Sequence, residues 1–317
     1  MVTPVTFTRA RSWICHRSLP SSDRLGGHTR LYGRDPTLVD ELAAIVESGD
    51  LRLIPYLYAR NETAVIAFDD SWCLMPWVTL QPSLCNSGAV TLLHADDHSD
   101  LGSPHLLHVA GNWRNAFTGR QVTLSSEPDV ADAIASGAIG IGTFLTPLLH
   151  MISHLTIRHL TRRMSGASSE IIYPTITKPY SLTCPLGRMS NSFVATGNQL
   201  ANPIRYTRTD DPEVWTDVDS NCRTLLVHLD LDVFANRHDS LPFGTRLTVP
   251  DLDSCVTEAR RMAKALRLID GISIRSFAIG LSPGFCPSSY WRHLLEAIYC
   301  ELADTHVLPP CLYANVH

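Results

Sequence analysis

The chain has 317 residues, of which 44% are hydrophobic and 18% are charged, and its formal net charge is −5. This composition is typical of a folded protein with a substantial core, and it excludes global disorder. The mild acidity gives no support for nucleic-acid binding, which usually needs a basic surface. No apolar segment approaches the roughly 18–20 residues of a membrane-spanning helix. We therefore expect neither nucleic acid nor a membrane as a partner.

The first 36 residues are rich in Arg, Ser, Gly and Pro, and we predict a loosely ordered N-terminal lead-in over 1–36. They contain no apolar stretch of the kind found in a secretory signal. The nine cysteines are scattered singly and form no C-x-x-C pair. This usage indicates reduced thiols in the cytoplasm and no zinc–thiolate site.

From residue 37 onward, apolar strands alternate with helices. The sequence "TLVDELAAIVESG" (37–49) predicts a helix that Thr37 caps and Gly49 ends. Residues 129–157 predict a helix that breaks at a group of glycines and then resumes, and the Ser/Thr/Asn/Pro-rich segment at about 161–220 predicts an irregular insertion. The other predicted elements are strands at 63–70, 87–97, 223–236 and 272–283 and helices at 251–268 and 288–303.

This alternation predicts an α/β protein with a mainly parallel sheet. In such sheets, ligands bind beyond the carboxyl ends of the strands. Three acidic clusters lie at predicted strand ends, at Asp69–Asp70, Asp96–Asp100 and Asp230–Asp232. The fold and the placement of charge therefore indicate the same edge of the sheet as the functional site.

The stretch "DDHSD" (96–100) places carboxylates and an imidazole directly after an apolar strand. In an extended chain, Asp96, His98 and Asp100 would share one side, and His228 would share a side with the acids of "DLD" (230–232). An oxygen-rich ligand set with histidine and without cysteine suits Mn²⁺ or Mg²⁺ better than structural zinc. Four carboxylates exceed what one divalent ion needs, so we expect two ions, roughly 3.5–4 Å apart.

Other histidines are weaker candidates. A D-x-D sequence alone is more often a turn or a solvated loop than a metal site. His150, His154 and His159 have no acid nearby in the sequence, so we interpret them as packing residues. His105 and His108 follow the acidic loop and are candidates to line the pocket.

Two motifs resemble those of a known superfamily. "DDHSD" (96–100) resembles the D-x-H-x-D signature of the arginase/agmatinase (ureohydrolase) superfamily, and "DLD" (230–232) resembles its second signature. The segments "LLHADDHSDL", "SGAIGIGTFLTPLLH", "LVHLDLDVFAN" and "FAIGLSPGFCP" resemble the branch of the peptide arginases and their uncharacterised relatives. These segments lie between about residues 63 and 300, so the resemblance covers most of the chain.

The resemblance implies a three-layer α/β/α fold, with 37–317 as one arginase-like domain. It also implies two Mn²⁺ ions bridged by a hydroxide that attacks the guanidinium carbon of arginine, which yields ornithine and urea. In peptide arginases the substrate is an arginine side chain within a ribosomally made peptide. Carried over by position, the metal ligands would be Asp96, His98, Asp100, Asp230 and Asp232. Asp100 would also take the proton of the hydroxide as the catalytic residue.

The chain departs from the superfamily at two places. A histidine ligand usually follows an acid at an earlier strand end, and Ser71 stands at that place here. Asp70, Asp69 or His228 would then have to complete the metal shell. A late glutamate that pairs with the guanidinium is replaced by Gly280. These departures keep two alternatives open: deacetylase-like amide hydrolysis on the same scaffold, and a non-catalytic descendant that binds metal or peptide.

Overall fold

The computed structural model describes residues 5–6, 13–15, 32, 35–163, 165–177, 187–194, 203–236, 250–269, 272–303 and 307–310. The strands are β1 (Val5–Thr6), β2 (Trp13–Cys15), β3 (Leu57–Arg60), β4 (Ala64–Ala67), β5 (Val90–Ala95), β6 (Leu106–Val109), β7 (Asn112–Asn115), β8 (Gln121–Val122), β9 (Leu155–Leu160), β10 (Ser168–Thr177), β11 (Gly187–Val194), β12 (Ile204–Thr209), β13 (Thr224–Asp230) and β14 (Ile274–Gly280). The helices are α2 (Leu38–Val46), α3 (Met75–Asn86), α4 (Glu127–Ala135), α5 (Leu145–Met151), α6 (Pro212–Thr216), α7 (Leu252–Arg267) and α8 (Ser288–Glu301). Three 3₁₀ turns complete the described elements, namely η1 (Leu51–Tyr56), η2 (Asp70–Leu74) and η3 (Leu231–Val233).

All of these strands belong to one sheet, in the order β1-β2-β3-β4-β14-β13-β5-β9-β12-β10-β11-β6-β7-β8. The six strands from β4 to β12 pair in parallel. The strands on both flanks pair antiparallel. The parallel core is the one predicted, and the antiparallel margins extend it beyond the prediction.

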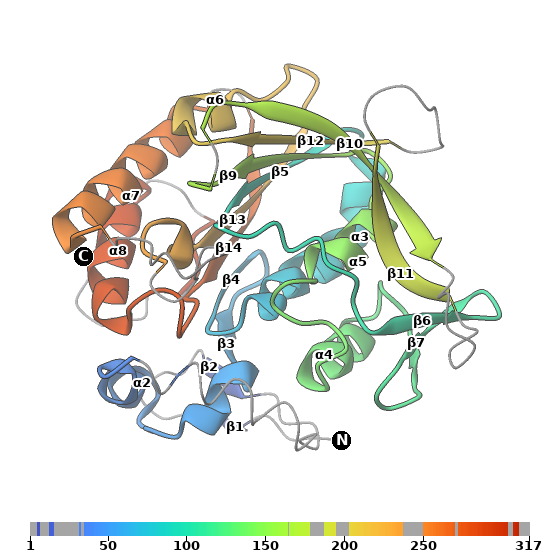
Figure 1. Ribbon diagram of the computed structural model, residues 1–317, viewed down its shortest axis with the longest axis horizontal. Helices are drawn as coiled ribbons and strands as arrows, with labels where there is room; N and C mark the ends of the chain where they lie inside the picture. The colour runs from blue at the N-terminus through green and yellow to red at the C-terminus, as the bar shows by residue number, and fades with distance from the viewer. Residues whose placement is uncertain are drawn as a thin grey trace, which may run out of the picture.

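Helices cover both faces of this core. In Figure 1, α7 and α8 lie on one side of the strands and α3 and α5 on the other. Helix α7 buries an apolar stripe that includes Cys255, Ala259 and Met262, while its charged residues face outward. Such one-sided helices are typical of the outer layers of an α/β protein. The three-layer α/β/α architecture is therefore confirmed.

Two predicted segments fold differently from the prediction. The predicted break at the glycines of 129–157 is observed between α4 and α5, but the end of this segment is strand β9 rather than helix. Gly137, at φ +85°, ends α4 in the left-handed conformation that glycine adopts most readily. In β9, Leu155 and Ile157 are buried while the residues between them are partly exposed, which is the alternation of a strand.

The segment 161–220 was predicted to be irregular, yet its described residues include β10, β11, β12 and α6. Its polar composition reflects strands of which one face is partly exposed, as in β10, where "SSEIIYPTIT" has few fully buried residues. Most of the predicted lead-in, 1–36, lies outside the described residues, while β1 and β2 pair at one edge of the sheet.

The strand order positions the site. Strand β13 lies between β5 and β14, and β4 lies on the other side of β14. Because these strands are parallel, their carboxyl ends meet at one edge, and the three acidic clusters follow β4, β5 and β13. Across the described part of the chain, none of the helices combines the length and hydropathy of a membrane span.

Candidate metal centre

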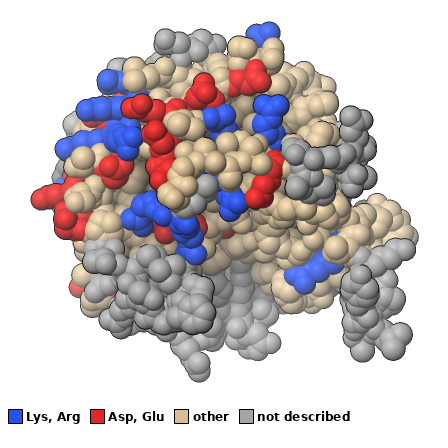
Figure 2. Space-filling view, turned by 45° about the horizontal axis from the view of Figure 1, so that its top comes forward, with Lys and Arg blue, Asp and Glu red and all other residues tan. Residues whose placement is uncertain are grey.

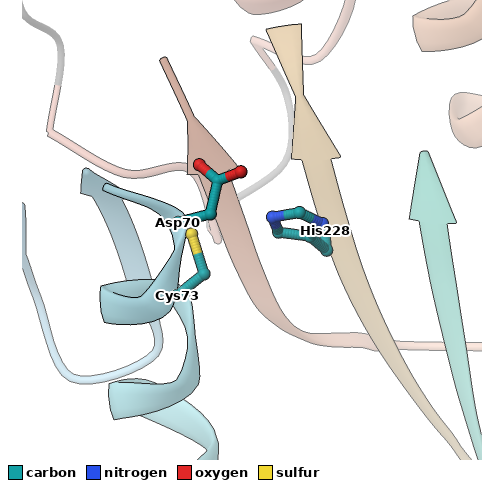
Figure 3. Close-up of side chains that lie close together, drawn as sticks. All are labelled: Asp70, Cys73 and His228. Atoms are coloured by element: carbon teal, nitrogen blue, oxygen red, sulfur yellow. The ribbon is translucent and has the colours of Figure 1, made fainter. Parts of the chain in front are cut away.

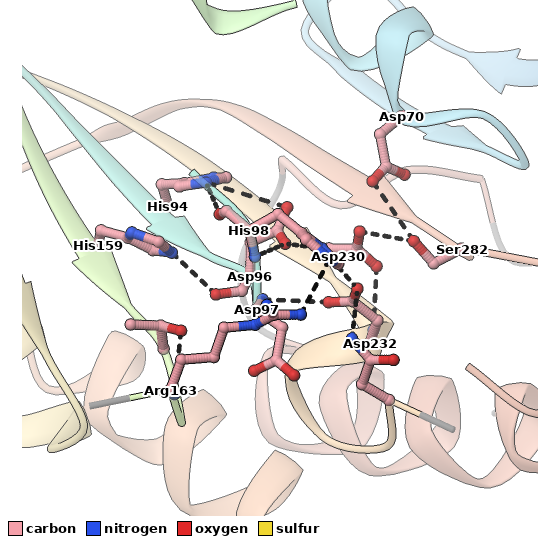
Figure 4. A network of polar contacts seen from close by, with 12 residues as sticks. Asp70, His94, Asp96, Asp97, His98, His159, Arg163, Asp230, Asp232 and Ser282 are labelled. Atoms are coloured by element: carbon pink, nitrogen blue, oxygen red, sulfur yellow. Dashed lines mark hydrogen bonds and ion pairs between the residues drawn. The ribbon is translucent and has the colours of Figure 1, made fainter. Parts of the chain in front are cut away.

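The five residues predicted as metal ligands meet beyond the carboxyl ends of β5 and β13. Figure 4 shows Asp96, His98, Asp230 and Asp232 among them. One ligand atom from each of Asp96, His98 and Asp232 lies within 4.8 Å of the other two. Nδ1 of His98 is 3.0 Å from Asp232 Oδ2 and 3.3 Å from Asp96 Oδ1. Asp100 lies equally close to Asp96. Asp230 adjoins Asp232, whose backbone N–H donates to Asp230 Oδ1 at 3.0 Å.

A sixth side chain, that of Asp70, joins this group. One of its oxygens lies within 4.8 Å of ligand atoms of Asp96 and Asp100, and its carboxyl group shares a hydrogen bond with that of Asp230. The hydroxyl of Ser282 donates to Asp230 Oδ2 at 2.6 Å and to Asp70 Oδ2 at 3.5 Å. We call Asp70, Asp96, His98, Asp100, Asp230 and Asp232 the carboxylate cluster.

The place predicted for a missing histidine ligand needs correction. Ser71 does not line the pocket; it is fully buried, and its hydroxyl donates to Asp69 Oδ1. Asp69 caps the 3₁₀ turn η2 through the backbone N–H of Ser71 at 3.1 Å. Of the residues left open, Asp70 therefore lies in the cluster beside Asp96 and Asp100.

Gly280 is adjacent to Asp70. A Cβ atom built on Gly280 would overlap Oδ1 of Asp70. The glycine at the end of β14 therefore leaves the space that the Asp70 carboxylate fills. A larger residue at position 280, such as the glutamate of the superfamily, would therefore collide with Asp70 in its present position.

The backbone, rather than strand alternation, brings the acids of "DDHSD" together. Strand β5 ends at Ala95, and the backbone N–H of His98 donates to Asp96 Oδ1 at 2.5 Å. Asp100 adopts φ +52°, a left-handed conformation that aspartate tolerates better than most residues. The turn therefore folds Asp100 back toward Asp96, so the extended chain assumed from the sequence is not the geometry observed.

Almost all of the cluster is removed from water. Each of its aspartates is at most 4% exposed, whereas the side chain of His98 is 33% exposed. Burial, reinforced by neighbouring carboxylates, raises the pKa values of Asp70, Asp96 and Asp230 well above their usual range. Burial also raises the pKa of Asp100 to about 7. Packed acids of this kind repel one another unless protons or a cation neutralise them.

Three buried oxygens of the cluster test whether a cation fits. Asp70 Oδ1, Asp96 Oδ2 and Asp100 Oδ2 have no hydrogen-bond partner among the described residues. A buried polar atom without a partner costs free energy, and for a carboxylate the cost is greater. Carboxylate oxygens aimed at a common point are also the donors that hard divalent cations prefer. The buried Asp/His cluster can therefore hold a metal ion.

The cluster residues other than Asp96 line a pocket of about 550 Å³. Three of its lining residues were not identified from the sequence: Arg163, Tyr206 and Arg208. Arg163 follows β9, and the other two lie on β12, in the segment predicted to be irregular. Nη2 of Arg163 is 3.1 Å from Nε2 of His98. Nδ1 of His98 is the ring nitrogen that faces the carboxylates of Asp96 and Asp232.

The remaining histidines fall into two groups. His105 and His108 do not line the pocket; their rings lie against Phe117 and Trp113 at the antiparallel margin of the sheet. His159 is a buried packing residue, as predicted, and it also contributes to the pocket wall. Its Nε2 is 2.8 Å from the backbone carbonyl of Asp96, so it supports the start of the acidic turn.

The outer surface shows mixed charge. On the face in Figure 2, the described Lys and Arg side chains are interspersed with Asp and Glu rather than gathered in one basic patch. Nucleic-acid binding usually depends on such a basic patch. The pocket is therefore the candidate functional site.

A scan of this chain against protein-family models finds no match, and a search of curated proteins finds none either. The function is therefore inferred from the residues and geometry of the carboxylate cluster.

Proposed function

We propose that the protein is a metal-dependent hydrolase of the ureohydrolase type, which converts arginine side chains of a ribosomally made peptide to ornithine and releases urea. The observation that carries the proposal is the convergence of Asp96, His98, Asp100, Asp230 and Asp232, of which all but Asp96 line one pocket. The unpartnered oxygens of the cluster support a cationic occupant.

The metal of this proposal is Mn²⁺, with two ions in the cluster. Two ligand groups overlap at Asp96: one includes His98 and Asp232, and the other includes Asp70 and Asp100. A shared carboxylate is a common way to hold two ions side by side, and a set dominated by oxygen suits Mn²⁺ or Mg²⁺. When bound, the ions would lower the pKa of water and so supply a nucleophile near neutral pH.

In this proposal Asp100 moves the proton. Asp100 is buried beside Asp70 and Asp96, and its Oδ2 has no hydrogen-bond partner among the described residues, so this oxygen is open to a proton. Oδ2 of Asp100 would accept the proton of the attacking water as its oxygen bonds to the guanidinium carbon. The proton then passes to the side-chain nitrogen as the carbon–nitrogen bond breaks, leaving ornithine and urea. Ser282 holds Asp230 in place through its 2.6 Å hydrogen bond.

The charge of the pocket wall favours a second candidate, deacetylase-like hydrolysis of an amide. Arg163 and Arg208 line the pocket and would repel a cationic guanidinium. Among the described lining residues, Asp97 is the one carboxylate outside the cluster, and its Oδ2 is 3.7 Å from Nη2 of Arg162. A guanidinium would therefore compete with an arginine for its counter-ion, whereas a neutral acyl-amine would not.

Two peptide substrates separate these candidates. The Mn²⁺-loaded protein is incubated with a peptide that contains arginine and with the same peptide carrying acetyl-lysine at that position. Urea and an ornithine-containing peptide support the first proposal, while acetate and free lysine support the second. Asp232→Asn serves as the control that removes a cluster ligand, so its rate should fall at least 100-fold. Turnover of neither peptide by a protein with its metal bound would refute a catalytic function of either kind.

A further inference from the structure

Below the carboxylate cluster, three histidines stand in a row across the sheet. His228 on β13 pairs in register with His94 on β5, which pairs with His159 on β9. The ring centroids of His94 lie 5.0 Å from those of His228 and 4.6 Å from those of His159. All three rings are at most 2% exposed. The proposed function uses His159 only as a pocket wall and assigns nothing to His228.

The hydrogen bonds of the row fix the tautomer of His228. Nε2 of His94 is 3.0 Å from the backbone carbonyl of His98, which can only accept, so this nitrogen carries the proton. A neutral imidazole carries one proton, so Nδ1 of His94 accepts. Nδ1 of His228, 2.9 Å away, must then donate to it. This leaves Nε2 of His228 with a bare lone pair.

That lone pair faces two further ligand atoms. A ring nitrogen of His228, a carboxylate oxygen of Asp70 and the sulfur of Cys73 all lie within 4.8 Å of one another, and Nδ1 of His228 is already bonded to His94. Figure 3 shows a ring nitrogen of His228 turned toward Asp70, with the Cys73 sulfur beneath the carboxylate. Nε2 of His228 and Oδ1 of Asp70 have no hydrogen-bond partner among the described residues. Asp70 is 4% exposed and the other two are fully buried.

From this geometry we propose that Asp70, Cys73 and His228 form an inner metal site for Zn²⁺ or a similar borderline divalent ion. Zinc is bound by nitrogen, sulfur and oxygen ligands, and the inner site offers one of each. The carboxylate cluster, with five aspartates and one histidine, suits harder ions. On binding the ion, the buried Cys73 thiol would release its proton to solvent and coordinate as a thiolate. Asp70 would connect the inner site with the carboxylate cluster.

A metal ion bound at this place would take the lone pairs of both unpartnered atoms at once. The spacing of the sequence does not indicate Cys73 as a partner of Asp70 and His228, because Cys73 is 155 positions before His228 and belongs to no recognisable spacing of metal ligands. Only the adjacency of η2 to the β13–β14 core brings them together.

Cobalt absorption tests the inner site separately from the proposed activity. Metal-stripped protein is titrated with Co²⁺, and the near-ultraviolet thiolate-to-cobalt charge-transfer band is recorded. The carboxylate cluster contains no sulfur, so Co²⁺ bound there does not produce this band. We expect the band in the unmodified protein, its loss in Cys73→Ser, and its retention in Cys255→Ser, which alters a buried thiol that donates to the Phe234 carbonyl. Absence of the band, or its persistence in Cys73→Ser, overturns the proposal.

A second measurement uses only the unmodified protein, so it tests the inner site even if the Cys73→Ser protein fails to fold. X-ray absorption of the unmodified protein with one equivalent of Zn²⁺ should show one sulfur neighbour at about 2.3 Å. A shell of nitrogen and oxygen alone would overturn the inner site. Neither result depends on urea release, so the inner site and the proposed function can fail independently.

Discussion

Asp70 is the residue through which the structure most changes the interpretation of the sequence. The pattern "FDDS" directed attention to Ser71, because the superfamily places a histidine after an acid there. The structure turns Ser71 toward Asp69 and places Asp70 in the carboxylate cluster, in the space that Gly280 leaves. A one-residue shift at the start of a 3₁₀ turn cannot be read from spacing alone, because the turn rotates each side chain differently from a strand.

Asp70 and Ser71 therefore form a matched pair for mutagenesis. Asp70→Ala should weaken Mn²⁺ binding at one of the two cluster positions by at least tenfold, since even changes to residues around metal ligands cost about 10–100-fold. Ser71→Ala, the buried control, should leave Mn²⁺ affinity unchanged because its hydroxyl contacts Asp69. Calorimetric Mn²⁺ titration of both variants provides the measurement. Equal effects of the two substitutions would disprove the assignment of Asp70 to the cluster.

At the scale of elements, the strands that carry the acids were predictable and their surroundings were not. Strands β4, β5 and β13 are apolar runs that end in aspartates, and each was predicted from that pattern. Strand β9 was hidden within a helix-like run, and β10 to β12 were hidden by polar residues. The pairing of strands that are distant in the sequence determines which residues line the pocket. The sequence alone therefore could not place Arg163, Tyr206 and Arg208 there.

Helix ends show the same limit. Thr37 was predicted as the local cap of α2, but its side chain does not cap that helix, and Pro287, which precedes α8, makes no side-chain cap either. Asp35 instead accepts from the backbone N–H of Ser288 at 2.7 Å, and from the N–H and hydroxyl of Thr37 at 3.1 and 2.9 Å. Asp35 is 6% exposed. One carboxylate thus joins the starts of two helices that are far apart in the sequence.

Replacement of Asp35 by alanine should consequently destabilise the fold. Loss of a helix cap costs about 1–2 kcal/mol of the free energy of unfolding, and here a buried N–H loses its acceptor as well. Asp40→Ala, an exposed position on α2, is the control and should cost less than about 0.5 kcal/mol. Urea denaturation of both variants measures the difference. Similar unfolding midpoints for the two would mean that the Asp35 contacts contribute nothing.

At the scale of the whole molecule, the buried acids should make stability depend on pH and on metal. The pKa values of Asp70, Asp96, Asp100 and Asp230 are raised, so the folded state holds protons that the unfolded state releases. Their contribution is present below the usual aspartate pKa and is lost as pH rises through the folded values, about 7 for Asp100. The buried histidines act in the opposite direction, but only below their usual pKa of about 6.5.

Above pH 6.5 the acids remain together with His98: burial lowers the pKa of His98, but its hydrogen bond to Asp232 and the charge of Asp232 raise it to about 9. The acids and His98 both hold protons in the folded state, so they change stability in the same direction. In the presence of a chelator, the thermal unfolding midpoint should fall as pH rises from 6.5 to 8. The free energy of unfolding should fall by about 1.4 kcal/mol per pH unit for each proton that the folded state holds in excess of the unfolded state. Added Mn²⁺ should flatten this dependence, because the cation replaces the protons. A midpoint that rises with pH in the chelated protein would contradict the description of the cluster.

Manganese titration of the metal-stripped protein by calorimetry tests the central claim most directly, namely that the carboxylate cluster is a metal centre. The unmodified protein should bind two equivalents of Mn²⁺, and Asp232→Asn should lose at least one of them while keeping its circular dichroism spectrum. Asp232 is fully buried, and its Oδ2 is 3.0 Å from His98, so its charge is integral to the cluster. No saturable binding to the unmodified protein, or identical binding to Asp232→Asn, would show that the buried aspartates and His98 do not hold a metal ion.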